Sequence, residues 1–429
     1  MHRIEIELEQ RIVILDGAMG TMIQRYGLEE KDYRCDRLQL HSVELKGNTD
    51  LLNLSRPDII REIHGQYLEA GADIISTNTF GANSISQSDY GTSALVAEIN
   101  YQGASIAREA ADEMYQADPS KPRFVAGAMG PTTKLASMSP QVNDPGFRAI
   151  HFDQLVEAYT EQANALIEGR IDLFLLETIT DTLNAKAALF ALEQLFEQMG
   201  RKYPIMVSGT ITDASGRILS GQTIEAFLIS LSHAPLLSVG LNCALGASEL
   251  KPYLPVLDKA SSCYVSTHPN AGLPNQFGGY DQTPDEFASL LYDFARNGWV
   301  NIVGGCCGTT PQHIKAAANA LRGIPPRPKS GKKKIANEHT MTDQAIRELI
   351  EKWCHKETRE GKPTFTMQEL LHILSEVEDE KTFLQLKSTF DQEKKLYHAE
   401  QAMLLNANIF GRYQYLRAEN RLKIVNVGR

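Results

Sequence analysis

The sequence predicts an α/β protein in which residues 1–325 form a (β/α)8 TIM barrel, followed by a small all-helical C-terminal segment. Short apolar runs alternate with amphipathic helical patterns along this part of the chain. Near-continuous apolar strands separated by helices indicate a parallel sheet that helices cover on its outer side. Eight strand–helix units fit a barrel of this length. A doubly wound sheet is the competing fold, but no Gly-x-Gly-x-x-Gly motif follows the first strand.

The predicted strands are short, apolar and followed by turn residues. They cover residues 11–16, 72–78, 124–128, 173–177, 205–209, 238–242, 263–267 and 301–304. A clear helical period marks residues 57–70, 155–167, 183–199, 224–232 and 287–297. In a TIM barrel the functional residues lie at the C-terminal ends of the strands. Those ends are therefore where a site is expected.

The last predicted strand runs into two adjacent cysteines between glycines, in residues 304–308. Adjacent thiols rarely bond to each other, because the eight-membered ring strains the peptide. Zinc favours thiolates in a tetrahedral array, and a catalytic site leaves one position open. Cys243 also ends an apolar strand before a turn of small residues. We therefore expect Cys243, Cys306 and Cys307 to meet on one rim of the barrel and bind a metal.

The remaining cysteines, Cys35, Cys263 and Cys354, have no such pattern and are expected to be buried, unreactive thiols. Six scattered cysteines in a chain of 429 residues do not resemble a disulfide framework. This usage indicates a reducing, cytoplasmic environment.

Two acidic residues also stand at strand ends. Asp16 precedes a glycine, where an aspartate is often only a turn former. Glu177 follows four apolar residues, and a carboxylate in such surroundings needs a cation or a proton. His268, which precedes a proline, is expected to hydrogen-bond the backbone rather than to bind a metal.

Charge and hydropathy exclude several classes of function. The net charge of −10 supports neither nucleic-acid binding nor attachment to an anionic membrane surface. No apolar run approaches the roughly 20 residues that span a bilayer. The first ten residues lack the apolar core of a signal peptide.

The composition changes after residue 325. Residues 326–340 are rich in proline and lysine and are expected to be a linker. Residues 341–429 show helical patterns of unknown role, including the capping box Thr366-Met367-Gln368-Glu369. This region either docks a partner protein or packs on the barrel, and we favour docking.

Several motifs together resemble a known family. They are Leu15-Asp16-Gly17-Ala18-Met19-Gly20-Thr21-Met22, Thr77-Asn78-Thr79-Phe80, Glu177-Thr178, Gly240-Leu241-Asn242-Cys243, His268-Pro269-Asn270-Ala271-Gly272 and Gly304-Gly305-Cys306-Cys307-Gly308-Thr309-Thr310-Pro311. Residues 5 to about 325 resemble the zinc- and homocysteine-binding barrel of the homocysteine S-methyltransferases. The likeness is greatest to the N-terminal module of cobalamin-dependent methionine synthases.

The resemblance implies a zinc-dependent methyltransferase that converts homocysteine to methionine. Cys243, Cys306 and Cys307 would bind Zn2+ and act in catalysis, with the homocysteine sulfur in the open position. A free thiol has a pKa of about 8.5 and is mostly protonated at neutral pH, whereas a metal-bound thiol is deprotonated. The zinc thiolate would then take the methyl group.

The resemblance also assigns the substrate-binding residues. Asp16 and Glu177 would bind the ammonium group of homocysteine, and the backbone at Gly17, Ala18 and Met19 its carboxylate. Asn242 is expected to be a further substrate-binding residue.

The chain lacks the folate barrel and the cobalamin module of methionine synthases, and it has no Asp-x-His-x-x-Gly motif. The methyl donor is therefore expected to be methylcobalamin, carried by a corrinoid or folate-binding partner protein or supplied as a free molecule. A non-catalytic homocysteine-binding or sensing subunit is the alternative.

Overall fold

The computed structural model describes residues 2–213, 215–276 and 278–329, and the structural statements below concern these residues. The chain divides into two units, Met1–Gly331 and Lys332–Arg429, and the barrel belongs to the first. The expected helical region at 341–429, most of the expected linker, and Cys354 lie outside the described residues.

Eight parallel strands form a single sheet in the described part of the chain. They are β1 (Val13–Ile14), β2 (Ile74–Ser76), β3 (Phe124–Met129), β4 (Leu173–Ile179), β5 (Ile205–Gly209), β6 (Ser238–Gly246), β7 (Tyr264–Asn270) and β8 (Ile302–Val303). Their order is β1-β8-β7-β6-β5-β4-β3-β2. A parallel bridge between Leu15 and Ile74 joins the two ends of this order. The sheet therefore closes into a barrel, which confirms the predicted TIM-barrel fold.

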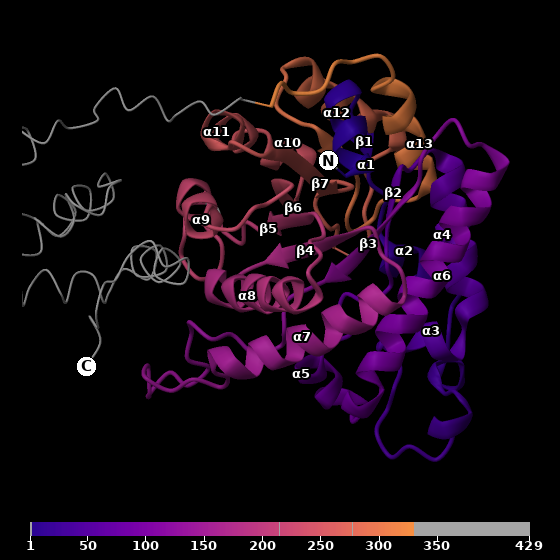
Figure 1. Cartoon of the computed structure of the whole chain (residues 1–429), viewed down its shortest axis with the longest axis vertical. Helices are drawn as coiled ribbons and strands as arrows, with labels where there is room; N and C mark the ends of the chain where they lie inside the picture. Colours follow the sequence, from indigo (N-terminus) through magenta and orange to yellow (C-terminus); the bar gives the residue numbers. More distant parts are fainter. Residues whose placement is uncertain (1, 214, 277, 330–429) are drawn as a thin grey trace, which may run out of the picture. The chain divides into compact units, whose positions relative to one another are not determined.

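Helices surround the strands (Figure 1). They are α1 (Arg3–Gln10), α2 (Met19–Gln24), α3 (Leu52–Ser55), α4 (Pro57–Ala70), α5 (Ser84–Gln87), α6 (Val96–Ala117), α7 (Phe152–Glu168), α8 (Thr182–Met199), α9 (Ile224–Leu231), α10 (Ala247–Leu250), α11 (Leu254–Ala260), α12 (Pro284–Arg296) and α13 (Pro311–Ala320). Helix α4 has the predicted bounds, because Pro57 suits its first turn and Gly71 ends it with a left-handed φ of 109°. The long helix α6 was not predicted.

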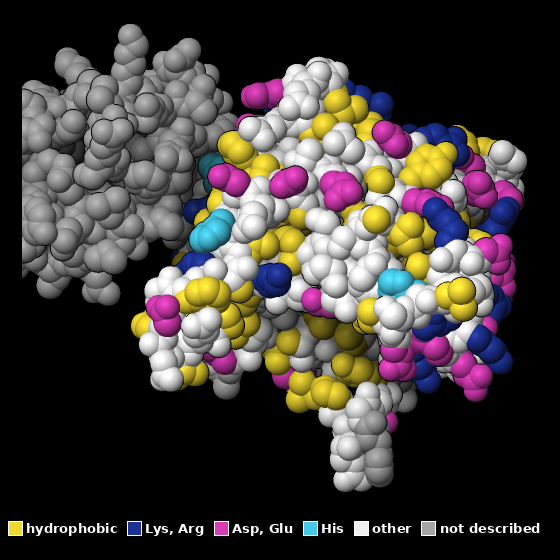
Figure 2. Space-filling model, turned by 90° about the horizontal axis from the view of Figure 1, so that it is seen from below, with side chains coloured by type: hydrophobic (Ala, Val, Ile, Leu, Met, Phe, Trp, Pro, Cys, Tyr) yellow, Lys and Arg dark blue, Asp and Glu magenta, His cyan; other side chains and the backbone are white. Residues whose placement is uncertain are grey.

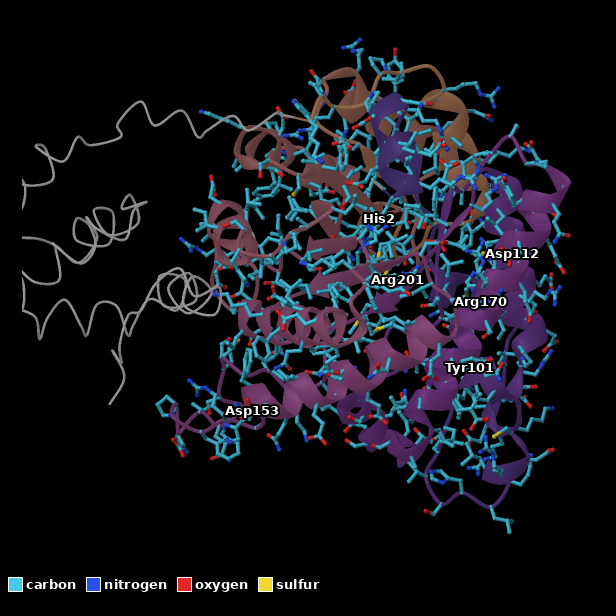
Figure 3. All side chains as sticks on the ribbon, in the orientation of Figure 1. His2, Tyr101, Asp112, Asp153, Arg170 and Arg201 are labelled. Atoms are coloured by element: carbon cyan, nitrogen blue, oxygen red, sulfur yellow. The ribbon has the colours of Figure 1, made fainter. Side chains whose placement is uncertain are left out.

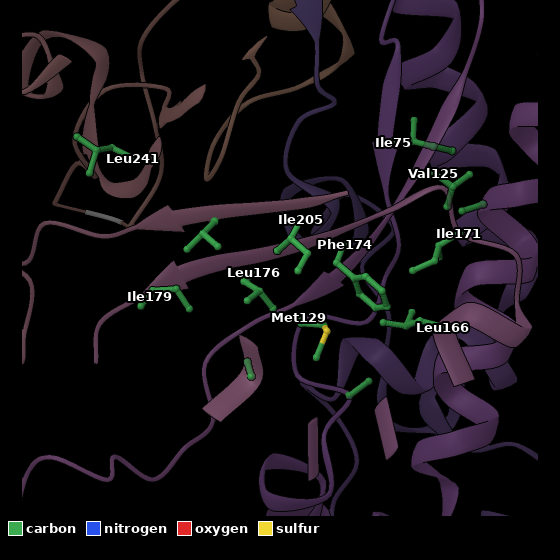
Figure 4. Close-up of a cluster of buried hydrophobic side chains, with 14 of the residues drawn as sticks. Ile75, Val125, Met129, Leu166, Ile171, Phe174, Leu176, Ile179, Ile205 and Leu241 are labelled. Atoms are coloured by element: carbon green, nitrogen blue, oxygen red, sulfur yellow. The ribbon is translucent and has the colours of Figure 1, made fainter. Parts of the chain in front are cut away.

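The hydrophobic core has two parts. The larger part fills the space between the strands and the outer helices, where Phe174 of β4 and Leu166 of α7 lie in one cluster (Figure 4). The smaller part lies inside the barrel. There Ile4 and Leu8 of α1 cluster with the first residues of several strands, including Val13 of β1. Helix α1 thus closes the N-terminal end of the barrel, which leaves the C-terminal end for a site.

Arg327 anchors the end of the described chain. Its side chain is fully buried and donates to the Asp258 carboxylate at 2.6 Å. It also donates to the backbone oxygens of Asp258, Ser261 and Cys263 at 2.8, 2.9 and 3.1 Å. The Arg327 backbone oxygen accepts a hydrogen bond from the Asn301 side chain at 2.7 Å. Arg327, which sequence patterns place in a linker, is therefore held against the residues that precede β7 and β8.

The outer surface of the barrel carries ion pairs within helices and between helices and loops. Asp112 of α6 pairs with Arg108 of the same helix at 2.8 Å. It also pairs at 3.9 Å with Arg170, which follows α7 (Figure 3). None of the described helices is both long and apolar enough to cross a membrane.

Candidate metal and substrate site

The structure brings together the three cysteines that the sequence singled out. The Sγ atoms of Cys243, Cys306 and Cys307 all lie within 4.8 Å of one another, and the Cys243 and Cys307 sulfurs are 3.7 Å apart. All three side chains are partly buried at the C-terminal ends of β6 and β8. Cys35 and Cys263 do not belong to this cluster and are half-buried rather than fully buried.

Backbone strain directs Cys243 toward the other two thiols. Cys243 and Ala244 have left-handed φ angles of 59° and 54°, and the register of β6 shifts between Asn242 and Gly246. Such conformations cost on the order of 1–3 kcal/mol each and occur mainly at functional sites. The bulge takes Cys243 out of the regular strand and lets its sulfur reach Cys307.

Neighbouring strands hold the Cys306-Cys307 turn rigidly. The Cys306 amide donates to Pro269 O at 2.8 Å, and the Cys307 oxygen accepts from the Ala271 amide at 2.9 Å. The Thr309 hydroxyl donates to Cys306 O at 2.6 Å. A side chain at Gly305 would collide with Thr309, so the turn needs glycine at that position.

The electrostatics of the three thiols call for a cation. Hydrogen bonds from Cys243 and Cys306 lower the pKa of Cys307 to about 3. Hydrogen bonds with Cys243 and Cys307, together with burial, raise the pKa of Cys306 well above its ordinary value. One thiolate is thus stabilised by its neighbours, whereas three thiolates so close together require a positive charge between them. A set of three sulfur ligands fits zinc and similar soft cations.

Asp16 lies at the end of β1 with a buried side chain. Its carboxylate accepts hydrogen bonds from the Ser76 amide at 2.8 Å and the Ser76 hydroxyl at 3.0 Å. Burial, together with the nearby charge of Glu177, raises the pKa of Asp16 to about 8, although the hydrogen bonds from Ser76 lower it. A positively charged ligand group would stabilise both carboxylates.

Glu177 lies at the end of β4 and faces His268 of β7. The distance from Glu177 Oε2 to His268 Nε2 is 3.7 Å. Neither ring nitrogen of His268 has a hydrogen-bond partner among the described residues, so the expected backbone bond is wrong. His268 pairs in register with Asn242 of β6, and its buried ring faces Glu177 instead of a backbone group.

Asn242 lies between the carboxylates and the thiols. Its Oδ1 accepts from the Thr178 amide at 3.0 Å, and its Nδ2 donates to the Thr178 hydroxyl at 2.9 Å. The same Nδ2 atom is 4.0 Å from Cys306 Sγ. Asn242 therefore contacts the residue that follows Glu177 and also one of the cysteines.

The loop after β1 is tied to the cysteine turn. The Ala18 amide donates to Thr309 Oγ1 at 3.2 Å, and the Ala18 oxygen accepts from Tyr67 at 3.1 Å. The Ala18 amide thus already has a partner within the protein. Met19 begins α2, so its amide is one of the groups at a helix start that lack an intrahelical acceptor. In the loop of residues 17–19, the Met19 amide is therefore better placed than the Ala18 amide to bind an anion.

Comparison with known proteins identifies the family. The family model described as homocysteine S-methyltransferase matches residues 13–321, a range that includes every site residue described above. The chain belongs to the homocysteine S-methyltransferase family. The protein is therefore a methyltransferase.

Two solved structures have the same fold as this methyltransferase. They are the metallated and oxidized forms of the homocysteine methyltransferase MmuM from Escherichia coli, with TM-scores of 0.56 and 0.55. Each is 22% identical in sequence. The metallated form matches 74% of this chain and 98% of that chain, and the oxidized form matches 72% and 95%.

Sequence patterns did not single out Tyr280 as a site residue of this homocysteine S-methyltransferase family member. Tyr280 hydrogen-bonds the Cys307 sulfur, which contributes to the low pKa of that thiol. Burial and the charge of Cys307 raise the pKa of Tyr280 to about 12, so its hydroxyl stays protonated and donates. Tyr280 lies in a loop after β7, outside any strand or motif, and only the folded chain brings it to the cysteines.

Proposed function

We propose that this protein is a zinc-dependent homocysteine S-methyltransferase that forms methionine and uses methylcobalamin on a partner protein as its methyl source. The observation that carries the proposal is the placement of three converging cysteines and two carboxylates at the same end of one barrel. A reducing, cytoplasmic environment would keep these thiols available for a metal.

The site has a partner for each polar group of homocysteine. Asp16 and Glu177 would pair with its ammonium group, because the negative charge of Glu177 acts on Asp16 and a positive charge nearby would offset it. The Met19 amide at the start of α2 would donate to its carboxylate. The substrate sulfur would then point toward the cysteines.

The chain's own residues hold the reacting end in place. Cys243, Cys306 and Cys307 would bind the metal, and the hydroxyl of Tyr280 donates to Cys307. Zinc at this position would lower the pKa of the homocysteine thiol and so supply the nucleophilic thiolate. The strained bulge at Cys243 and the hydrogen-bonded turn at Cys306 fix these sulfurs before the substrate arrives.

Exposed apolar side chains in loops at the C-terminal ends of the strands support a protein-bound donor. Large hydrophobic residues with more than a third of their surface exposed include Phe80, Met138, Val142, Phe147, Leu219 and Leu273. Figure 2 shows hydrophobic side chains gathered in patches on one face of the molecule. Apolar surface of this kind is typical of a face that another protein covers.

The pH dependence of product binding tests the role of Asp16. Methionine carries the same ammonium group as homocysteine but no titratable thiol. Because the pKa of Asp16 is raised to about 8, its carboxyl group is mostly protonated below that pH and must lose the proton to pair with an ammonium group. We expect methionine affinity to rise between about pH 6 and pH 8, by at most tenfold per pH unit. Isothermal titration calorimetry would measure it.

Asp16→Asn is the matched control for that experiment. It should bind methionine more weakly and show a flatter pH profile, because residue 16 then has no proton to lose. A wild-type affinity that does not change over this pH range would contradict the role given to Asp16.

The methyl donor is tested with the full chain and with a chain that ends at Gly331. Both should form methionine from homocysteine and free methylcobalamin when zinc is supplied. Ending at Gly331 retains Arg327, which the barrel needs. If residues 341–429 dock the donor, the shorter chain should show a raised KM for a protein-bound donor only.

Two other outcomes would contradict parts of this proposal. If the zinc-loaded full chain binds homocysteine but forms no methionine from methylcobalamin, the proposed donor is wrong. If both chains use a protein-bound donor equally well, residues 341–429 do not dock it.

A further inference from the structure

We propose that Asn242 is a positioning residue that couples the carboxylate half of the site to the thiol half. Its side-chain amide forms two hydrogen bonds with Thr178, the residue after Glu177, and the next residue in the chain is Cys243. This inference rests on the proposed function, since it assigns homocysteine binding to Glu177 and zinc binding to the cysteines.

The contact between Asn242 and Thr178 fixes both partners. Asn242 is fully buried, and its amide oxygen and nitrogen bond to the amide and hydroxyl of Thr178 at 3.0 and 2.9 Å. Since one atom accepts and the other donates, the side chain has one satisfied orientation. The Thr210 hydroxyl, just after β5, donates to the backbone oxygen of Asn242 at 2.9 Å and so also fixes the main chain at this position.

Thr178 has a backbone conformation that needs such support. Its φ is 57°, in the left-handed region that β-branched residues rarely adopt. The register of β4 shifts between Leu176 and Ile179, so Glu177 and Thr178 form a bulge. Strained conformations persist only where the surroundings over-determine them. Because Glu177 lies in the same bulge, the direction of its carboxylate depends on the contact with Asn242.

The thiol half of the site depends on the same residue. Asn242 precedes Cys243, whose own φ is 59°, and its Nδ2 lies 4.0 Å from Cys306 Sγ. Asn242 therefore contacts Cys306 through its side chain and, as the preceding residue, helps to fix the backbone of Cys243.

The backbone hydrogen bonds of the sheet cannot connect Thr178 of β4 with Asn242 of β6. Strands β4 and β6 are not neighbours, because β5 lies between them. A side chain must therefore reach across, and Asn242 does so with one acceptor and one donor. Leucine at position 242 is close in size and would remove both the acceptor for the Thr178 amide and the donor to its hydroxyl.

The experiment compares zinc-loaded wild-type protein with Asn242→Leu, Thr178→Val and Glu177→Gln. It measures zinc affinity by competition with a chromophoric chelator, KM and kcat for homocysteine with free methylcobalamin, and thermal stability. We expect Asn242→Leu to weaken zinc binding and to raise the KM for homocysteine, each by about tenfold, as for a lost hydrogen bond near charged groups. Glu177→Gln should raise only the KM.

Thr178→Val separates positioning from direct contact with the substrate. Valine keeps the branched shape and removes only the hydroxyl, so it breaks the bond from Asn242 Nδ2 and keeps the bond from the residue 178 amide. If Asn242 acts through Thr178, this variant also raises the KM, and the double variant raises it no further than Asn242→Leu alone. Thr178→Ser, which keeps the hydroxyl, should restore the wild-type KM.

The opposite results would overturn the inference. A Thr178→Val protein with a wild-type KM, or additive effects in the double variant, would show that Asn242 does not act through the Thr178 hydroxyl. Unchanged zinc affinity in Asn242→Leu would remove the link to the thiols. A wild-type protein that binds zinc but not homocysteine would contradict the proposed function and the homocysteine half of this inference, whereas the zinc measurement would still decide the thiol half.

Discussion

Replacing Cys306 by alanine is expected to abolish tight zinc binding and methyl transfer while the barrel stays folded. The backbone bond from Cys306 to Pro269 O does not involve the side chain, so the turn keeps its shape. Two sulfurs cannot hold zinc as three do. The loss in affinity should exceed the roughly 10–100-fold that follows from removing an outer partner of a metal ligand. Zinc content after gel filtration, activity, and circular dichroism would check these results.

A matched cysteine variant controls for the loss of a thiol as such. Cys35 lies outside the cluster, so Cys35→Ala should keep full zinc content and activity. In the wild-type protein, X-ray absorption should show Zn–S distances near about 2.3 Å. A Cys306→Ala protein with full zinc content and normal turnover would refute the assignment.

Arg327→Met is expected to lower the free energy of unfolding of the barrel by about 3 kcal/mol. Methionine keeps much of the apolar length but leaves three backbone oxygens and the Asp258 carboxylate without their donor. The loss is less than for a fully buried ion pair, because the Asp258 side chain is 38% exposed. Urea unfolding would show a lower midpoint with an unchanged slope.

Fluorescence can report this transition from the barrel alone. The chain has two tryptophans, Trp299 beside β8 and Trp353 outside the described residues, so the Trp353→Phe background leaves one reporter. Lys329→Met is the matched control, since Lys329 only stacks over the Tyr264 ring at 4.5 Å and should cost less than about 1 kcal/mol. Equal midpoints for the two variants would show that Arg327 is not an anchor.

Local sequence patterns predicted the barrel well because its strands and helices alternate with a clear period. Residues 57–70 show one apolar face between a proline and a glycine, and α4 has those bounds. Helix α6 was missed because its buried face is built largely from small residues, such as Ala104, Ala107 and Ala111. Alanine and glycine give a weak hydrophobic signal even where they pack closely.

The sequence predicts those site residues whose type and position at a strand end are informative, as for Cys243 and the cysteine pair. It does not predict the contacts that side chains make across the barrel. The bonds between Asn242 and Thr178 join residues 64 positions apart, and the bulges that create them leave no periodic signal. For the same reason the sequence predicts a backbone bond for His268, although its ring faces Glu177. Sequence patterns place Arg327 in a linker because its neighbours are prolines and a lysine.

Helix α1 and Arg327 have a practical consequence for handling this enzyme. Both pack against residues at the starts of the strands, whereas the cysteines lie where the strands end. A tether or reporter fused ahead of α1 would lie at the N-terminal end of the barrel, opposite the cysteines. If the protein is immobilised on a resin through its first residues, the C-terminal end of the barrel should therefore face the solution. It would then stay accessible to homocysteine and to a bulky methyl donor.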